Sequence, residues 1–403
     1  MRIALEHMVK SNRNMLHRLQ LNIFCVLFLA FFVLNTFVLN SAWLGGALLI
    51  VYLTVFGWEV GGIVTREEKA ILRWWLGVWI LLSSLMIVLT ASYYIAGVTA
   101  NVVYVAVLLT VPIILWASRR ATHMSIFSHA HDLWHGKRHK IPRAVWLTSA
   151  LIVVSLAIFF SLLAAHPVTD AVRSVWERLP SAVLVGFVLP CALLFSMLVR
   201  GRERALSLIL LCALLFAFLA VAAISFPIGF GFDSFIHKAT ESHLAQFGTI
   251  TPKPFYYIGQ YVLVLLLHHG FRIPIDLADT FLVPTLAAFL LPMAWFFAAA
   301  HITRKRSIAM ATLMGLFLLP LAPFIVTTPQ SLANLWTLLL ILASVPYLLE
   351  KEHPRLRVLF IGAFATLFIH PIAGIPSLLF FMFLATDPSR TNPRTPMTNR
   401  VVR

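Results

Sequence analysis

Long apolar runs alternate with short polar segments along most of this chain. Runs such as Leu21 to Leu39 and Ala205 to Phe226 contain almost no charged residue and reach the roughly 20 residues that a helix needs to cross a bilayer. The strands of a membrane barrel would be shorter and would alternate apolar with polar positions. The pattern therefore predicts an all-α polytopic integral membrane protein.

About twelve runs are expected to be transmembrane helices. They are 21–39, 42–62, 74–91, 97–115, 145–163, 181–198, 205–226, 278–299, 308–325, 332–349, 358–369 and 375–383. The run from Tyr256 to His269 is apolar as well, but its length of about 14 residues is too short for an ordinary span. It is expected to be a re-entrant or interfacial amphipathic segment that belongs to an external loop.

The charged residues predict the orientation of these helices. Hydrophobic residues make up 60% of the 403 residues and charged residues 11%, yet the formal net charge is +16. Lys and Arg concentrate in alternate loops, and such loops face the cytoplasm in membrane proteins. We therefore assign the charge to membrane orientation and expect no nucleic-acid partner. The prediction is a cell (inner) membrane protein with both termini cytoplasmic, and its membrane lipids are partners throughout.

The loops of the second half decide how the short apolar run is counted. If Tyr256 to His269 crossed the membrane, the basic loops Arg304 to Arg306 and Lys351 to Arg357 would both lie outside. If it does not cross, both are cytoplasmic.

A third polar region, from His129 to Lys140, has histidines at metal-ligand spacing, but its many basic residues favour an amphipathic segment on anionic lipid.

This orientation gathers three polar segments on the outer face. They are Gly229 to Lys253, "TTPQ" from Thr327 to Gln330, and "HPIAGIP" from His370 to Pro376. Gln330 and His370 each adjoin a proline in a turn at the outer end of a span. As hydrogen-bonding groups they could line a shared substrate cavity, and the alternative is a plain loop role.

Within the first of these segments, a helix is expected from Phe232 to Phe247, with Gly248 as its stop signal. Asp233, His237 and Glu241 lie at i, i+4 and i+8 and would form one polar stripe. An acid four residues before an imidazole can orient it or take a proton from a hydroxyl, so Asp233 and His237 are the candidate catalytic residues. With Glu241 they could hold a divalent metal ion. The alternative is a helix N-cap at Asp233 with two solvated side chains.

The segment "FDSFIHKATESHLAQFGTITPKPFYYIGQYVLVLLLHH" resembles the first external loop of the GT-C class of membrane glycosyltransferases. The similarity extends through "ADTFLVPTLAAFLLPMAWFFAAAHITRKRS", "TTPQSLANL" and "FIHPIAGIP", roughly the second half of the chain. The resemblance implies a polyprenyl-phosphate-linked sugar as donor, reaction at the outer face and inversion at the sugar, in the biosynthesis of cell-envelope glycan. Asp233 matches the loop acid that acts as general base or binds metal.

The resemblance also divides the chain, and the chemistry of the residues near the interface adds substrate-binding candidates. It implies an N-terminal transmembrane module of about six helices at 1–204, a GT-C-like module at 205–386 with the external loop 229–255, and a polar cytoplasmic tail at 387–403. Lys253, Lys238 or Arg272 could hold the donor phosphate, and Glu241 is the only substitute in the loop for a second acid. Tyr256, Tyr257 and Gln260 are further substrate-binding candidates, although tyrosines also serve as ordinary interfacial anchors.

A multi-span transporter or lipid flippase is the alternative function, and a catalytically inactive relative is a third. Transporters place their substrate and coupling groups near the bilayer midplane on broken helices, often in two related halves. This chain has no visible internal repeat, and its polar groups collect at one face. The distribution favours an enzyme.

Overall fold

The computed structural model describes residues 2–65, 70–120, 126, 141–172, 174–200, 203–349 and 356–386. This part of the chain is helical and contains no strand. The α-helices are α1 (Arg2–Leu34), α2 (Ala42–Val64), α3 (Ala70–Ala96), α4 (Ala100–Arg120), α6 (Arg143–Ala165), α7 (Ser181–Arg200), α8 (Arg204–Leu219), α9 (Val221–Ser225), α10 (Phe232–Phe247), α11 (Ile258–Leu265), α12 (Ile275–Thr303), α13 (Arg306–Ala311), α14 (Pro329–Leu349), α15 (Leu356–Ile369) and α16 (Pro371–Thr386). Short π-helical turns, η1 (Asn35–Leu39) and η3 (Leu266–Gly270), follow α1 and α11, and 3₁₀ turns lie at η2 (Val175–Glu177), η4 (Thr312–Leu318) and η5 (Ala322–Phe324).

Eight helices of the described chain are long and apolar enough to cross a membrane. They are α1, α2, α3, α4, α6, α7, α12 and α14. Five shorter apolar helical segments accompany them: Arg204–Leu219, Ile258–Gly270, Arg306–Leu318, Leu356–Ile369 and Pro371–Thr386. The prediction of an all-α polytopic membrane protein is confirmed.

Two runs that the sequence presented as single spans are interrupted. A turn at Ala220 separates α8 from α9 inside the predicted span 205–226. In the predicted span 308–325, regular α-helix ends at Ala311 and a 3₁₀ turn continues only to Leu318. Pro320 and Pro323 follow, and proline lacks the backbone N–H that a helix interior requires. Apolar composition alone therefore overstated the length of both helices.

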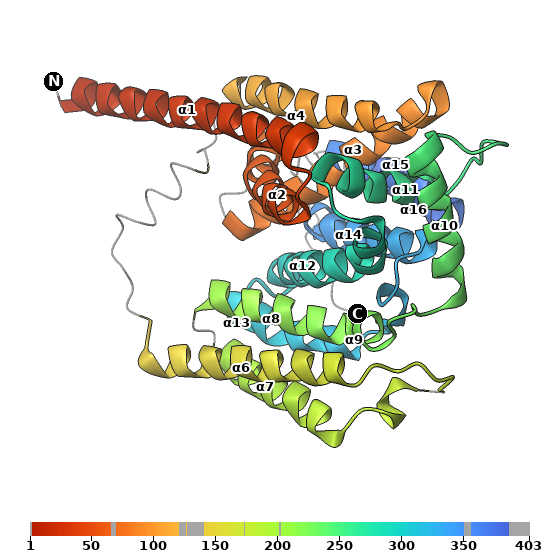
Figure 1. Cartoon of the computed structure of the whole chain (residues 1–403). Helices are drawn as coiled ribbons and strands as arrows, with labels where there is room; N and C mark the ends of the chain where they lie inside the picture. Colours follow the sequence, from red (N-terminus) through yellow and green to blue (C-terminus); the bar gives the residue numbers. More distant parts are fainter. Residues whose placement is uncertain are drawn as a thin grey trace.

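The bundle is organised around α3 and α12. Their apolar windows are 72% and 78% buried inside the protein, whereas those of α4 and α7 are 28% buried. Figure 1 shows α3, α12 and α14 in the middle of the molecule, with α1 and α4 along one side and α6 and α7 along the other. The outer helices expose many Leu, Val and Ile side chains, which suits helices that face hydrocarbon.

The short apolar run in the external loop forms α11 and η3. All eight residues from Ile258 to Leu265 are buried, and α11 contacts α3, α10, α12, α14 and α15. An interfacial amphipathic helix would expose one polar face. The buried α11 therefore differs from the interfacial helix that was one of the two predicted possibilities. A helix too short to span the bilayer can still lie within a membrane protein when other helices surround it.

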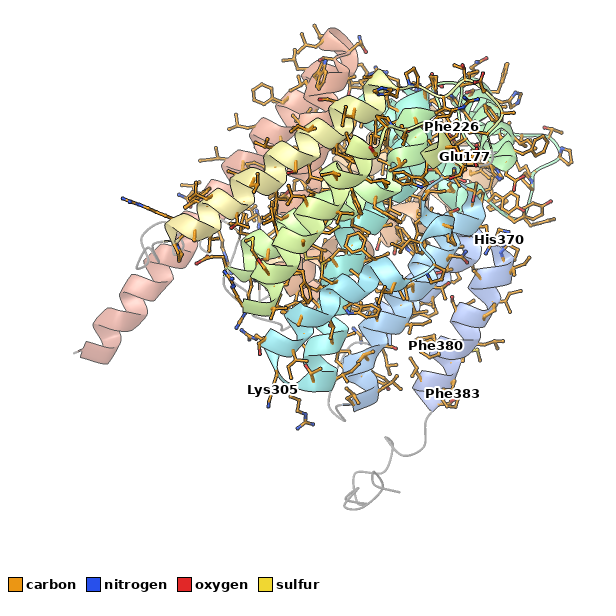
Figure 2. The ribbon with its side chains drawn as sticks, turned by 90° about the horizontal axis from the view of Figure 1, so that it is seen from below. Glu177, Phe226, Lys305, His370, Phe380 and Phe383 are labelled. Carbon is orange, nitrogen blue, oxygen red and sulfur yellow. The ribbon has the colours of Figure 1, made fainter. Side chains whose placement is uncertain are left out.

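Loops that the charge pattern placed on opposite sides of the membrane lie at opposite ends of the bundle. Figure 2 shows Glu177, Phe226 and His370 at one end and Lys305 and Phe383 at the other. We call the first the α10 end, because α10 lies across it (Figure 1). Backbone hydrogen bonds join loops at this end, from Val98 to Gly248 and from Tyr257 to Ile369.

The two predicted modules pack against each other extensively. α3, from the first half of the chain, contacts α11, α12 and α15 from the second, so the boundary near residue 204 does not coincide with a gap in the packing. The tail at 387–403, the histidine-rich segment at 129–140 and the loop at 351–355 lie outside the described residues.

Candidate functional site

α10 has the bounds that the sequence predicted, and glycines fix both of its ends. Gly231 (φ 80°) is the N-cap and Gly248 (φ 71°) the C-cap, whose N–H donates to the carbonyl of Leu244. Both φ values lie in the left-handed region that glycine adopts without strain. Asp233 therefore occupies the first turn, where its charge suits the helix dipole, and it is not the N-cap of the alternative reading.

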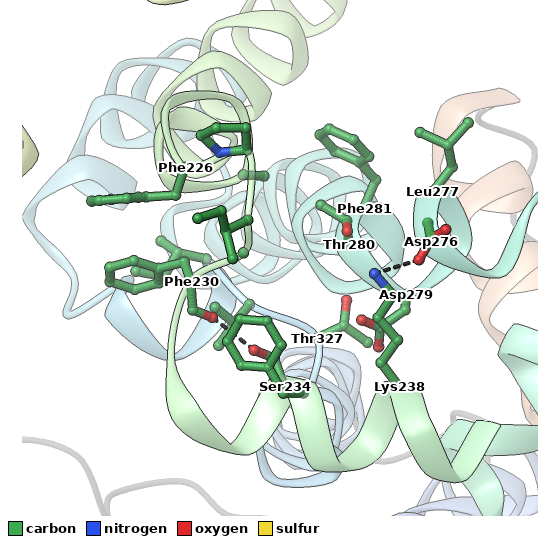
Figure 3. Close-up of a pocket in the computed structure, with 17 residues that line it drawn as sticks. Phe226, Phe230, Ser234, Lys238, Asp276, Leu277, Asp279, Thr280, Phe281 and Thr327 are labelled. Atoms are coloured by element: carbon green, nitrogen blue, oxygen red, sulfur yellow. Dashed lines mark hydrogen bonds and ion pairs between the residues drawn. The ribbon is translucent and has the colours of Figure 1, made fainter. Parts of the chain in front are cut away.

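A cavity of about 460 Å³ lies between α10, the first turns of α12 and the loops at 226–230 and 325–327. Figure 3 shows Lys238, Asp276 and Asp279 along one wall of this cavity. Its polar lining residues are Ser234, Lys238, Asp276, Asp279, Thr280 and Thr327, and its phenylalanines are Phe226, Phe230, Phe235 and Phe281. We call it the α10 cavity. It combines two carboxyl groups and three hydroxyls with four aromatic rings.

Local sequence features hold the far wall of the α10 cavity in place. Thr328 caps α14 with a hydroxyl that accepts from the N–H of Ser331 at 3.2 Å, and Pro329 opens the helix. The preceding Thr327 uses its hydroxyl to accept from the backbone N–H of Val283 on α12, also at 3.2 Å. The "TTPQ" segment is thereby held against α12.

A second, more apolar cavity of about 330 Å³ adjoins the first. The two cavities share Phe226, Phe230 and Ile325 as lining residues. The second is lined further by Trp176, Phe218 and other apolar side chains from α8, α9 and the loop before α7. A polar chamber thus lies next to an apolar groove at the same end of the protein.

Lys238 and Asp276 form an ion pair at the edge of the α10 cavity, drawn as a dashed line in Figure 3. The carboxylate is largely exposed, with 74% of its side chain accessible, whereas the lysine is at 35%. Exposed ion pairs are screened by water and contribute little to stability. A polar ligand can therefore replace either member of the pair at low cost.

Behind this wall lies a fully buried carboxyl group, that of Glu241. Its Oε1 accepts a hydrogen bond from the side-chain amide of Gln260 on α11. The carboxyl group of Asp279 on α12 lies within hydrogen-bonding reach of Glu241. Burial raises the pKa of Glu241 well above its ordinary value, and the charge of Asp279 raises it further, while Lys238 lowers it. These surroundings favour the protonated form of Glu241, which can donate a hydrogen bond to Asp279.

His237, one turn before Glu241 on α10, belongs to an aromatic cluster. Its Nδ1 lies 2.8 Å from the hydroxyl of Tyr261, and its ring centroid lies 5.4 Å from that of Tyr257. The ring centroid of Tyr257 in turn lies 5.1 Å from that of His370 and 4.5 Å from that of Tyr256. Burial lowers the pKa of His237, as does the neighbouring His370, while Asp233 raises it. Burial also lowers the pKa of His370.

The predicted site residues thus divide into groups. His237, Tyr256, Tyr257 and His370 meet in the aromatic cluster, and Glu241 and Gln260 meet beside the α10 cavity. Asp233 is exposed and is not among the residues that line either cavity. Its role as general base stays a prediction.

Two other substrate-binding candidates are engaged elsewhere. The ammonium of Lys253 donates to the backbone carbonyls of Tyr93 and Tyr94, at 3.4 and 3.0 Å. Gln330 is exposed and donates to the side chain of Asn334, one turn further along α14. Neither residue borders the two cavities.

The cations predicted to hold a donor phosphate are dispersed. Arg272 donates to the carbonyl of Thr36 and packs over the ring of Tyr104, at 5.7 Å from its centroid. Of the three predicted cations, Lys238 lines the α10 cavity, whereas Lys253 and Arg272 do not.

The predicted metal stripe does not converge on a single point. Asp233 is exposed, His237 contacts tyrosine rings and Glu241 is buried against another helix. Among the described residues, no group of three or more His, Cys, Asp and Glu side chains is arranged to hold a metal ion. The helix crosses the bundle end, so successive turns enter different environments although they share one face.

Sequence reasoning missed Asp276 and Asp279. They occur in "IDLADT", at i and i+3, just where an apolar run begins. Two acids on one face at the outer end of a span are a usable signal, because ionisable residues within such helices are usually functional. The proximity of Asp279 to Glu241 joins α12 to α10 and had no counterpart in the sequence.

Comparisons with protein-family models, with characterised proteins and with solved structures find no match to this chain. The function is therefore inferred from the chain's own residues and their geometry.

Proposed function

We propose that this protein is a membrane glycosyltransferase that moves a sugar from a polyprenyl-phosphate-linked donor to an acceptor at the outer face. One observation carries the proposal. The α10 cavity, lined by carboxyl and hydroxyl groups, adjoins an apolar groove at the α10 end of a membrane-embedded bundle. The pairing suits a molecule that has a polar head and a hydrocarbon tail.

The chemistry of the lining matches the two parts of such a donor. Carboxylate oxygens accept hydrogen bonds from sugar hydroxyls, and the threonine and serine hydroxyls can either donate or accept them. The tail of a polyprenyl lipid gains by staying among apolar side chains and hydrocarbon. Trp176 and Phe218 in the second cavity, with the shared Phe226, offer that surface.

The proposal includes the topology that the charge pattern predicts. Twelve spans arise if four shorter apolar segments, Arg204–Leu219, Arg306–Leu318, Leu356–Ile369 and Pro371–Thr386, cross the membrane alongside the eight long helices. α11 does not cross. Both termini and Lys305 then lie in the cytoplasm, and the α10 end faces outward.

A transporter or lipid flippase is the second candidate, and one observation favours it. Glu241 and Asp279 form a buried pair of interacting carboxyl groups, and membrane-embedded acids that exchange protons drive many pumps and transporters. This pair adjoins the outer loop at the α10 end, whereas transporters bind substrate near the midplane. The position of the pair therefore favours the enzyme.

Transfer can be tested with membranes of cells that express the whole chain. They receive short-chain polyprenyl phosphates that carry labelled hexose or pentose, and both the label in glycan and the free polyprenyl phosphate are measured. Membranes without the protein provide the control. We expect both products to appear only when the protein is present.

Two results would count against the proposal. If an abundant, folded protein cleaves none of the donors, the chain is not this transferase. If purified protein in liposomes moves a labelled lipid between leaflets without cleaving it, the flippase reading replaces the enzyme.

A further inference from the structure

The Glu241–Asp279 pair holds two buried oxygen atoms that accept no hydrogen bond from the described residues. Asp279 is 4% exposed and lines the α10 cavity. Oδ1 of Asp279 and Oε2 of Glu241 are buried and have no hydrogen-bond partner among the described residues. A proton held between the two carboxyl groups would satisfy both oxygens and leave one carboxylate charge on the pair.

Surrounding groups determine which member carries that charge. The amide of Gln260 occupies the other oxygen of Glu241, and Glu241 lies deepest, with no exposed surface. Charge is least costly where solvent or a ligand can reach it, so the proton stays on Glu241 and the charge on the cavity-lining Asp279. The arrangement is that of two carboxyl groups whose surroundings separate an acid from a base.

We propose that Asp279 is the general base of the α10 cavity and that Glu241 is the positioning residue that holds it. The inference rests on the proposed transfer function and names the residue that would accept the proton. It replaces the exposed Asp233 by an acid on α12 for this role.

The proposed step is balanced as follows. The acceptor hydroxyl oxygen forms a bond to the anomeric carbon of the donor, and the bond between that carbon and the phosphate oxygen breaks. The electron pair of the broken bond leaves with the polyprenyl phosphate. The hydroxyl proton passes to the carboxylate of Asp279, and solvent later removes it.

Charged and titratable groups face the pair from each helix packed against it. Lys238 comes from α10, Asp276 from α12 and Tyr261 from α11. Lys238 stabilises negative charge on the pair, and its own pairing with Asp276 limits that effect. Lys238, Asp276 and Tyr261 must therefore be left unchanged in every variant whose pH–rate profile is compared with that of wild type.

The first experiment compares Asp279→Asn with Glu177→Gln in the transfer assay described above. Asparagine keeps the size of the side chain but cannot accept the proton, so we expect transfer to fall by about 10² to 10⁴ at equal abundance. Glu177 is an exposed carboxylate at the same end of the protein, outside both cavities. Its variant should transfer at about the wild-type rate.

The second experiment uses Glu241, and it remains decisive if Asp279→Asn fails to accumulate. Glu241→Ala removes the hydrogen bond that stabilises the charged form of Asp279, so the acid side of the pH–rate profile should move to higher pH. Glu241→Gln restores a donor of similar shape and should return the profile toward that of wild type. A merely structural role would lower the rate without moving the profile.

The outcomes separate this inference from the proposed function. Wild-type protein that transfers sugar while Asp279→Asn transfers equally well would overturn the base assignment alone. So would a loss confined to Asp233→Asn, because the base would then lie on the exposed turn of α10. Absence of transfer by wild type from every donor would remove the function, and the base assignment with it.

Discussion

At the scale of single residues, environment rather than spacing assigns the roles. Asp233, His237 and Glu241 follow one another at four-residue intervals, yet one is exposed, one packs on tyrosine rings and one is completely buried. Burial disfavours the charged form of each titratable group. The pKa of the buried Glu241 is therefore raised well above its ordinary value.

Two histidines of the aromatic cluster make stability depend on pH. The pKa values of His237 and His370 are lowered in the folded protein, whereas unfolded histidine titrates near about 6.5. The unfolded chain then binds more protons, so stability is complete above that value and is lost as the pH falls below it. Replacing both histidines by glutamine should reduce the acid-induced loss.

Thermal unfolding in detergent at pH 7.5 and 5.5 measures this difference. Wild type should lose more of its midpoint temperature between the two pH values than the double variant does. A Gln substitution at the exposed His243 gives the control and should leave the wild-type loss unchanged. Equal losses in all three proteins would show that the histidines are not responsible.

At the scale of elements, close approach between helices depends on specific glycines. A Cβ atom at Gly45 on α2 would lie 1.5 Å from the backbone carbonyl oxygen of Phe271, whereas one at Gly46 would meet nothing within 4 Å. A backbone atom cannot move aside as a flexible side chain can. Gly45 is therefore required for close helix packing, whereas Gly46, the next residue of the same helix, has space for a side chain.

This contrast predicts opposite effects of two alanine substitutions. Gly45→Ala should destabilise the protein by about 1 to 3 kcal/mol, the usual cost of overpacking. Gly46→Ala should be neutral or stabilise by up to about 1 kcal/mol, because alanine favours helix more than glycine does. Denaturation of the two variants in the same micelles measures the difference. Equal stabilities would contradict the contact between α2 and the chain after η3.

At the scale of the whole molecule, the two ends of the bundle differ in chemistry. Basic segments meet at one end, where the side chain of Arg18 donates to the carbonyl of Arg119. Both cavities, the carboxyl pair and the aromatic cluster lie at the other, around α10. Such polarity is expected when one end faces the cytoplasm and the other carries the function.

Cysteine labelling tests the proposed orientation. Gln246→Cys on α10 and Ser307→Cys on α13 place exposed thiols at the two ends, in a chain whose native Cys25, Cys191 and Cys212 are replaced by alanine. An impermeant reagent on intact cells should label position 246 and reach position 307 only after permeabilisation. A permeant reagent on both variants controls for reactivity. Labelling of position 307 alone would reverse the orientation.

The sequence by itself determined the features that depend on local composition. Apolar run length predicted the all-helical membrane fold, because a bilayer core accepts backbone only when its hydrogen bonds are satisfied within the segment. The bounds of α10 followed from its amphipathic stretch and from Gly248, and the alternating basic loops predicted the two ends. Each of these signals acts within a few residues.

Tertiary structure decided what depends on contacts between distant segments. It showed that α11 is buried, that prolines interrupt the run after Arg306, and that Asp279 on α12 reaches Glu241 on α10. Nothing in the sequence near either acid reveals the other, because 37 residues, including all of α11, separate them along the chain. Burial and electrostatic interaction between side chains are properties of packed groups, and only the folded chain brings those groups together.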